Sequence, residues 1–299
     1  RYFASQMGPS TAALAVSGFA AADPGAVAVV ESWNGSTWTE TADVNTAKYA
    51  HANGGSQTAG LAFGGTTPSS NGQLCESWNG TSWTEIADLS TGKQGLSGGA
   101  TDNTSAIAYL GHTPPGQSGR SDASEELTVG GSVGAWSSGG DLNTARTALG
   151  NAGTQTAALG MGGIVSGTAL TSNESYNGST WTEIADLNTG ANSLGSNGTQ
   201  TSALAYGGQN TPPSGAETNK NESWNGSAWT EVANLNRTTS FIAGLGADNT
   251  SALAAGGTPN GVANTETWNG SAWTEVNDLN DGRRALFGIG TVTAALAFG

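Results

Sequence analysis

The sequence is short of charge, and of positive charge in particular. Charged residues make up 11% of its 299 residues, and nine Lys and Arg stand against 23 Asp and Glu, for a formal net charge of −14. Nucleic-acid binding needs a basic surface that displaces counterions from phosphates, and anionic membranes attract basic segments. We therefore expect no nucleic-acid partner. The acidity instead favours solubility.

Cysteine, histidine and long apolar runs are also scarce. Cys75 is the single cysteine, and His51 and His112 are the only histidines. One cysteine can neither close an intrachain disulfide nor supply a Cys-rich metal site, and no apolar run approaches the roughly 18 residues of a transmembrane helix. We expect no cofactor, no metal and no membrane insertion. No signal peptide is evident, and a chain that starts at Arg1 is expected to be a processed or trimmed product.

The sequence is rich in repetition. A motif of the form Glu-Ser-Trp-Asn-Gly-Ser-x-Trp-Thr-Glu recurs at intervals of about 47 residues. A second, apolar motif of the form Thr-Ala-Ala-Leu-Ala-Phe-Gly-Gly precedes each copy and closes the chain at 293–299. Copies of the first motif span 31–40, 76–85, 174–183, 222–231 and 266–275, with a degenerate sixth at 125–142.

Each repeat predicts four short strands. They are the run after the linker, the apolar motif, a strand on Glu-Ser-Trp and a strand on Trp-Thr-Glu. The Asn-Gly pair between the last two is typical of a type I′ hairpin turn. A four-stranded antiparallel unit cannot bury its faces alone, so the units must stack. The sequence therefore predicts one all-β domain over 1–299, a β-propeller of four-stranded blades; a β-solenoid would have a shorter period, and independent small domains would need larger cores.

The number of blades depends on the two ends of the repeat. Residues 283–299 repeat the pattern of residues 1–17, so the sequence holds seven inner-strand pairs but six outer pairs. We expect seven blades, the last one incomplete, with six as the alternative. The missing half-blade would come from a segment before Arg1 or from strands donated by another chain.

The repeats resemble the kelch family, in which a glycine pair ends the second strand and aromatic residues stand in the third and fourth. The matching residues are Gly64, Gly65, Trp78 and Trp83; Gly162, Gly163, Tyr176 and Trp181; Gly207, Gly208, Trp224 and Trp229; and Gly256, Gly257, Trp268 and Trp273. Trp-Asn-Gly stands where Tyr-Asp-Pro is usual, which is similar to the kelch-type repeats of bacteriophage virion and tail-fibre proteins.

The resemblance implies a function as well as a fold. It implies a non-catalytic structural or adhesive propeller of a virion or an extracellular or cell surface, which attaches to other structural proteins or to host surface glycans. A lectin-like, glycan-binding propeller is the alternative. Kelch propellers serve many roles, so the fold by itself does not decide between them.

The recurring Trp and Glu residues have structural and functional interpretations. Tryptophan stacks on sugars, but one Trp at the same place in each repeat is better explained by packing between blades. A glycosidase needs one carboxylate pair in one cleft, whereas these carboxylates recur. We therefore predict no catalytic residue and expect surface positions that discourage edge pairing. They are Glu31, Glu76, Glu174, Glu222 and Glu266 in the third strand, and Glu40, Glu85, Glu183, Glu231 and Glu275 in the fourth.

An acidic and a basic residue recur together in the linker between repeats. We expect a blade-to-blade ion pair or an Asx-turn there; no basic residue aligns after Asn234. The residues are Asp43, Asp88, Asp141, Asp186 and Asp278, and Lys48, Lys93, Arg146 and Arg283. The Asn-x-Ser/Thr sequons, such as Asn34 and Asn79, are either hairpin turns or glycosylation acceptors.

The connection between the second and third strands varies from repeat to repeat. It should share one face with the linkers, and variable loops on a uniform scaffold are typical of a binding surface. The loops are 18–30, 65–75, 112–124, 163–173, 208–221 and 257–265. Our candidate binding residues are His112, Arg120, Asn210 and Lys220. Ordinary solvated loops are the alternative, and a channel lined by the first strands is the other possible pocket.

Overall fold

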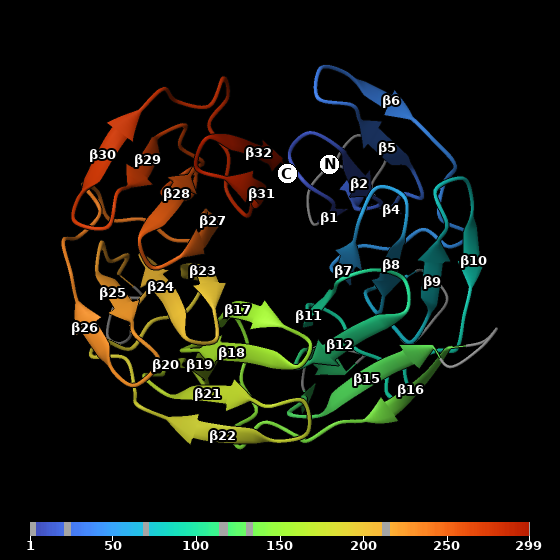
Figure 1. Cartoon of the computed structure of the whole chain (residues 1–299), viewed down its shortest axis with the longest axis horizontal. Helices are drawn as coiled ribbons and strands as arrows, with labels where there is room; N and C mark the ends of the chain where they lie inside the picture. The colour runs from blue at the N-terminus through green and yellow to red at the C-terminus, as the bar shows by residue number, and fades with distance from the viewer. Residues whose placement is uncertain are drawn as a thin grey trace. The chain divides into compact units, whose positions relative to one another are not determined.

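The computed structural model describes residues 4–20, 25–67, 72–113, 119–129, 134–210 and 216–298 (Figure 1). These residues form strands, turns and loops, with no helix among them. No helix that could span a membrane occurs in these ranges. The chain divides into two compact units, an N-terminal unit of residues 1–145 and a C-terminal unit of residues 146–299. A single domain over 1–299 stays a prediction.

The N-terminal unit holds three four-stranded antiparallel blades, drawn from blue to green in Figure 1. Blade 1 comprises β1 (Ser5–Met7), β2 (Ala13–Val16), β5 (Val30–Trp33) and β6 (Trp38–Glu40). Blade 2 comprises β7 (Ala52–Gly55), β8 (Gly60–Phe63), β9 (Cys75–Trp78) and β10 (Trp83–Glu85). Blade 3 comprises β11 (Ser97–Ala100), β12 (Ser105–Tyr109), β15 (Ser124–Val129) and β16 (Gly134–Ser138).

The C-terminal unit holds three further blades, drawn from green to red in Figure 1. Blade 4 comprises β17 (Gly150–Thr154), β18 (Ala157–Met161), β21 (Asn173–Tyr176) and β22 (Trp181–Ile184). Blade 5 comprises β23 (Gly195–Thr199), β24 (Ser202–Tyr206), β25 (Asn221–Trp224) and β26 (Trp229–Glu231). Blade 6 comprises β27 (Ala243–Asp248), β28 (Ser251–Ala255), β29 (Thr265–Trp268) and β30 (Trp273–Val276).

Four two-stranded sheets accompany the blades. One of them is the terminal pair β31 (Phe287–Thr291) and β32 (Ala294–Phe298). The other three lie inside the connections between a second and a third strand that vary from repeat to repeat. They are β3 (Phe19–Ala20) with β4 (Gly25–Ala26), β13 (His112–Thr113) with β14 (Gly119–Arg120), and β19 (Ile164–Val165) with β20 (Thr168–Ala169).

The all-β fold of propeller-type blades is therefore confirmed, and the expectation of seven blades is wrong. Six four-stranded blades form in the described ranges, which is the alternative that we kept. The reason is that the sequence holds six outer-strand motifs. The seventh inner pair, β31 and β32, consequently forms a two-stranded sheet.

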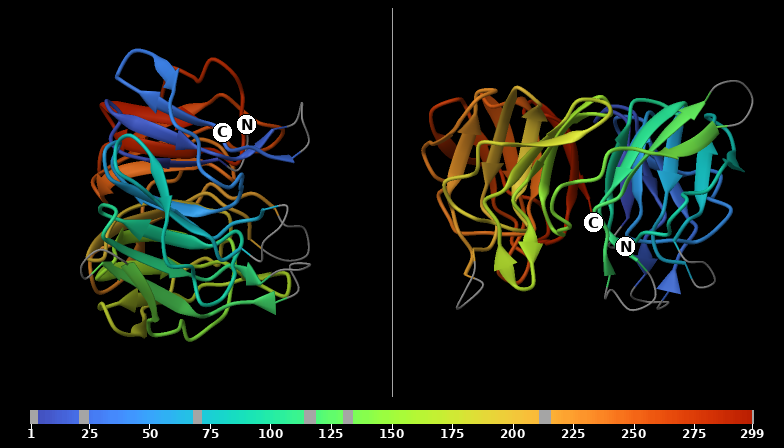
Figure 2. Two further views of the ribbon diagram at one scale, coloured as in Figure 1. Left: turned by 90° about the vertical axis from the view of Figure 1, so that its right-hand side faces the viewer. Right: turned by 90° about the horizontal axis from the view of Figure 1, so that it is seen from below.

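Within each unit, the first strands of successive sheets lie side by side. Strand β7 lies against both β1 and β11 in the N-terminal unit, and β23 lies between β17 and β27 in the C-terminal unit, where β31 continues the row. The blades of each unit thus stand face to face, as both views in Figure 2 show. Apolar side chains fill the space between them because the second strands are buried along their length, as in β8 and β24.

The outer hairpins differ from the predicted turn. Trp33 pairs with Trp38, so the loop between β5 and β6 has four residues and is not a two-residue type I′ turn. Only Gly35 has a positive φ, +93°, in this loop. Asn34 Oδ1 accepts hydrogen bonds from the backbone N–H groups of Ser36 and Thr37, both at 2.9 Å, and this Asx-type contact explains the wider loop.

The tryptophans pack as the repeat predicted. In blade 5, the rings of Trp224 and Trp229 lie 5.3 Å apart, and both are buried against Leu159 and Met161 of blade 4. Equivalent pairs occur in blades 2 and 6. The exceptions are Trp38 of blade 1, which is 36% exposed, and Trp33 and Trp136, which are half-buried. Packing, not sugar binding, accounts for the buried members.

Candidate functional site

Four of the five glutamates predicted on the surface of the third strands are buried, which corrects that prediction, and Glu31 is half-buried. The exposed fraction is 1% for Glu76, 1% for Glu174, 3% for Glu222 and 3% for Glu266. Glu125 of the degenerate repeat is 2% exposed. A carboxylate is rarely buried unless it is paired and hydrogen-bonded. Each of these groups must therefore find partners, and each finds them in the linker segment that precedes its own blade in the sequence.

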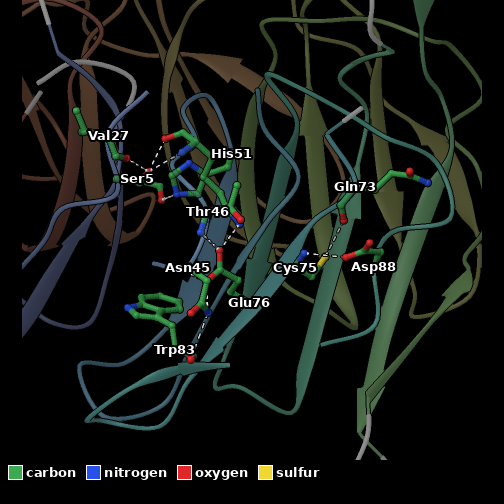
Figure 3. Close-up of polar contacts among 12 residues, drawn as sticks. Ser5, Val27, Asn45, Thr46, His51, Gln73, Cys75, Glu76, Trp83 and Asp88 are labelled. Carbon is green, nitrogen blue, oxygen red and sulfur yellow. Dashed lines mark hydrogen bonds and ion pairs between the residues drawn. The ribbon is translucent and has the colours of Figure 1, made fainter. Parts of the chain in front are cut away.

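Glu76 shows the arrangement in full (Figure 3). Its Oε2 atom accepts hydrogen bonds from the backbone N–H of Asn45 at 2.6 Å and from Asn45 Nδ2 at 2.9 Å. Its Oε1 atom accepts one from the Thr46 backbone N–H at 3.3 Å and lies 3.0 Å from Lys48 Nζ. The side-chain amide of Asn45 also reaches the Trp83 carbonyl. One carboxylate thus fastens blade 2 to the linker that leaves blade 1.

In two further blades, a buried cation contacts the equivalent Oε1 atom of the glutamate. Lys93 Nζ lies 3.4 Å from Glu125 Oε1, and Arg146 Nη1 lies 2.6 Å from Glu174 Oε1. Burial lowers the pKa of Lys93, and Glu125 acts in the opposite direction. Lys48, Lys93 and Arg146 are fully buried. Replacing one member of such a pair with a neutral residue is expected to destabilise the fold, because the remaining charge is left buried without a counter-ion.

The predicted ion pair between the linker aspartate and the linker cation is therefore wrong: the three cations pair with the strand-three glutamates. The aspartate stays within its own blade. Asp43 Oδ1 accepts the N–H of Val30 at 3.2 Å, and Asp88 Oδ1 accepts that of Cys75 at 3.3 Å. Arg283 instead lies 3.7 Å from Asp281 and is exposed.

Two blades of the C-terminal unit depart from this pattern. Ala191 stands five residues after Asp186, where Lys48 stands five residues after Asp43. Glu222 still accepts the Asn188 N–H at 2.8 Å, Asn188 Nδ2 at 2.9 Å and the Thr189 N–H at 2.9 Å. Within the described ranges, no Lys, Arg or His forms an ion pair with Glu222. Its carboxylate is held by amides alone.

In the linker before blade 6, the basic residue stands at a different position, three residues after Asn234. Glu266 accepts the Asn236 N–H at 2.9 Å and Asn236 Nδ2 at 2.7 Å. Arg237 donates to the Gly256 carbonyl at 2.6 Å; its burial lowers its pKa, and the charge of Glu266 opposes this. Thr239 occupies the usual cation position and is buried.

The glutamates of the fourth strands are exposed, as predicted. Four of the five stand opposite a buried glutamate, as Glu85 does opposite Glu76, and Glu40 stands opposite the half-buried Glu31. In such a pair, the strand-three glutamate is buried and contacts the linker, and the strand-four glutamate faces solvent. This is unlike a glycosidase, where two carboxylates face one substrate. Within the described part of the chain, no group of three or more His, Cys, Asp and Glu is arranged to hold a metal ion.

A serine–histidine contact is one feature that the sequence did not reveal. Ser5 Oγ of β1 and His51 Nε2 form a buried hydrogen bond (Figure 3). Burial, and then the charge of Lys48, lower the pKa of His51 to about 3, so the imidazole is neutral at pH 7. His51 stands where the other repeats have an apolar residue, such as Leu96 or Leu194, three places after the cation position. This polar residue at an otherwise apolar position was the sequence feature that could have revealed the contact.

The single thiol is enclosed as well. Cys75 Sγ donates to the Gln73 carbonyl at 3.3 Å (Figure 3). Burial raises the pKa of Cys75 to about 12. Because the thiolate is the nucleophile, this thiol is unreactive at neutral pH.

The variable loops lie beside the linkers, as expected for one shared face. Gln94 of a linker and His112 of a loop exchange backbone hydrogen bonds at 3.0 and 2.9 Å. Asn192 and Gln209 do the same in the C-terminal unit. In four of these loops, some residues lie outside the described ranges; they are 21–24, 68–71, 114–118 and 211–215.

The four candidate binding residues fall into two pairs. In the N-terminal unit, His112 and Arg120 face each other in register on β13 and β14. In the C-terminal unit, the Asn210 N–H donates to the Ala216 carbonyl, and Lys220 Nζ lies 3.1 Å from Glu231 Oε2. Their role in binding stays a prediction. Comparison of the sequence with protein-family models and with curated proteins found no match.

Proposed function

We propose that this protein is a non-catalytic structural or adhesive propeller of a virion or extracellular surface, which attaches to proteins or to other surface components. The observation that carries this proposal is the burial of the repeated strand-three glutamates. These are the most frequent candidates for chemistry in the sequence, and their oxygens are taken up by linker amides and cations. The kelch-like and phage-like sequence pattern supports the same proposal.

The loop face is the surface that we assign to attachment. The blades repeat closely, whereas the loops between second and third strands differ, and three of them form short hairpins. A rigid scaffold that presents differing loops is a common basis of recognition. The hairpin of β13 and β14 places an imidazole beside a guanidinium, and Arg120 is exposed. We expect this pair to contribute most to attachment in the N-terminal unit.

A cell-binding assay tests the proposal. Fluorescently labelled protein is incubated with a panel of bacterial cells, untreated, protease-treated or periodate-treated, and bound label is counted. We expect binding that protease abolishes and that the His112→Ala/Arg120→Ala variant reduces at least fivefold. Glu85→Gln, an exposed change on a fourth strand, is the matched control and should bind like the parent.

Other results would redirect or overturn the proposal. Loss of binding after periodate and not after protease would favour the lectin-like alternative, which a glycan array would then define. Absence of binding to the whole panel, together with hydrolysis of any member of a glycan panel that one Glu→Gln change abolishes, would establish an enzyme and contradict the proposal.

A further inference from the structure

The sheet of β31 and β32 in the C-terminal unit has an open edge. In each of the six blades, the second strand pairs with the first strand on one side and with the third strand on the other. Strand β32 repeats the second-strand sequence and pairs with β31. In the described part of the chain, no strand pairs with the other side of β32, which we call the β32 edge. Such an edge presents backbone N–H and C=O groups that can pair with an added strand.

The apolar cluster beside this edge lacks the tryptophan pair of its counterpart. Between blades 5 and 6, side chains of the linker and of the inner strands pack with two tryptophans of the outer strands. The cluster includes Leu204, Leu235, Ala252, Ala254, Trp268 and Trp273. Between blade 6 and the terminal sheet, the cluster contains the corresponding inner-strand and linker residues, and no tryptophan is among its described members. It includes Leu253, Leu279, Ala295 and Ala297.

This second cluster is more open than the first. Leu279, Ala295 and Ala297 are half-buried, whereas Leu235 is 2% exposed and Ala252 is fully buried. A tryptophan side chain buries a large apolar area, so two of them account for the difference. The terminal sheet therefore exposes an apolar surface that an outer hairpin covers at the neighbouring interface.

The linker before β31 carries the polar groups that hold a third strand elsewhere. Asn280 and Arg283 stand where Asn45 and Lys48 stand in the linker before blade 2. There, the Glu76 carboxylate lies 2.9 Å from Asn45 Nδ2 and 3.0 Å from Lys48 Nζ. The side chain of Lys48 is fully buried by this arrangement, whereas that of Arg283 is 42% exposed. The linker thus offers an amide and a guanidinium at the two positions that bind a strand-three glutamate.

We propose that the β32 edge binds a β-hairpin with the sequence of the outer motif, Glu-Ser-Trp-Asn-Gly-Ser-x-Trp-Thr-Glu, supplied by a different polypeptide. The hairpin adds antiparallel to β32, its two tryptophans cover the open cluster, and its first glutamate pairs with Asn280 and Arg283. Strand addition draws affinity from backbone hydrogen bonds and specificity from alternate side chains. A second copy has no hairpin to spare, because all six outer hairpins of the described ranges are paired within their own blades.

Blade 6 gives the register of the bound hairpin. There, Ala252 of the second strand pairs with Trp268, and Trp268 Nε1 donates to the Asn249 carbonyl at 3.0 Å. Ala295 and Val292 are the equivalent residues of the terminal sheet. The first tryptophan of the bound hairpin therefore stands opposite Ala295 and donates to the Val292 carbonyl.

Asp281 competes with the hairpin for Arg283. Its Oδ2 atom lies 3.7 Å from Arg283 Nη2, and both side chains are exposed. Thr46 stands at the position of Asp281 in the linker before blade 2, where its backbone N–H donates to Glu76. Asp281→Thr removes the competing carboxylate and should strengthen hairpin binding.

The test uses a fluorescein-labelled peptide with the sequence of residues 264–279, which contains the outer hairpin of blade 6. Its fluorescence anisotropy, titrated with the whole chain, should show saturable binding of one peptide per chain. The peptide with Trp268→Ala/Trp273→Ala should bind about tenfold more weakly or worse, and a scrambled peptide should not bind. Hydrogen exchange should slow at the amides of residues 294–297 when the peptide binds, and should be unchanged in β30.

A cycle between protein and peptide tests the role of Arg283. Arg283→Met should weaken binding of the parent peptide about fivefold or more, and should not weaken binding of the peptide with Glu266→Gln. The neighbouring Arg284 is also exposed, so Arg284→Met is the matched control and should bind like the parent. The proposal does not involve the loop face. His112→Ala/Arg120→Ala should therefore bind the peptide normally, which separates a failure here from a failure of the proposed function.

The same measurements can overturn the proposal. Absence of saturable binding, equal binding of the scrambled peptide, or slowed exchange in β30 in place of β32 would contradict the assigned edge. An Arg283→Met effect that persists with the Glu266→Gln peptide would contradict the assigned ion pair. A concentration-dependent dimer that the peptide dissociates would show that a second copy occupies the edge, and would contradict the assignment to a different polypeptide.

Discussion

Two glutamates at equivalent places in the C-terminal unit have different surroundings. Glu174 has the guanidinium of Arg146 at 2.6 Å, whereas Glu222 has Ala191 at the equivalent linker position. Both glutamates are nevertheless buried to the same degree. The comparison teaches that hydrogen bonds from the linker are sufficient to keep the carboxylate in place, and that the cation is a separable addition to that frame.

Replacing Arg146 with Ala would make the surroundings of Glu174 a copy of those of Glu222. We expect it to lower the free energy of unfolding by about 3–5 kcal/mol, because Glu174 is left buried with its charge unpaired. Chemical denaturation monitored by tryptophan fluorescence measures this loss. If the variant were within 0.5 kcal/mol of the parent, the two surroundings would be equivalent and the cation would have no energetic role.

Asn188 is the corresponding weak point beside Glu222. Asn188→Ala removes the Nδ2 bonds to Glu222, at 2.9 Å, and to the Trp229 carbonyl, at 3.3 Å. We expect a loss of about 2 kcal/mol, since hydrogen bonds to charged groups contribute about 1.5–3 kcal/mol. The matched control is Asn45→Ala, which removes the same bonds where Lys48 still faces Glu76. Equal losses in both would contradict the claim that Glu222 depends more on its amides.

The interface around Lys48 should respond to pH through His51. Its pKa is about 3 in the folded chain and about 6.5 when unfolded. Between these values the unfolded state binds more protons, so stability is complete above pH 6.5 and declines as the pH falls toward 3. The decline from pH 6.5 to 5 should be about 1.5 kcal/mol. His51→Leu, which restores the residue of the other repeats, should flatten the profile of Tm against pH over this range; an unchanged profile would contradict the assignment.

The exposed glutamates should matter least. Glu183→Gln and Glu85→Gln are each expected to change the free energy of unfolding by less than about 0.5 kcal/mol, because both side chains face solvent. Glu174→Gln, one strand away from Glu183, should cost several times more. Thermal unfolding of the three variants side by side provides the contrast, and similar losses would mean that burial does not distinguish the two sets.

Much of the blade could be predicted because its signals are local. The alternation of apolar runs, the Asn-Gly pairs and the evenly spaced Trp residues all act within a few positions of one another, and they placed the four strands of each repeat correctly. The detail of the outer turn was wrong because Asn34 Oδ1 binds backbone N–H groups and widens the loop. The predicted number of blades was wrong because we counted the seven inner-strand pairs. The number of four-stranded blades follows the six outer-strand motifs.

The buried glutamates could not be placed by the same means. Charged side chains are exposed in most proteins, and the partners of Glu76 lie about 30 residues earlier, in the linker of another blade. The signal was present as a correlation, because basic linker residues precede buried glutamates in three interfaces. Ala191 and His51, which break the pattern, are visible when the repeats are aligned, and the contacts around both differ from those in the other repeats.

A double-mutant cycle between Arg146 and Glu174 tests the central claim most directly. Unfolding free energies are measured for the parent, Arg146→Ala, Glu174→Gln and the double variant. If the repeated carboxylates serve to hold the preceding linker through buried cations, the coupling energy should be about 2–3 kcal/mol, so that the double variant is much less unstable than the two losses added together. Additivity within 0.5 kcal/mol would contradict the claim and would reopen the repeated glutamates to other roles.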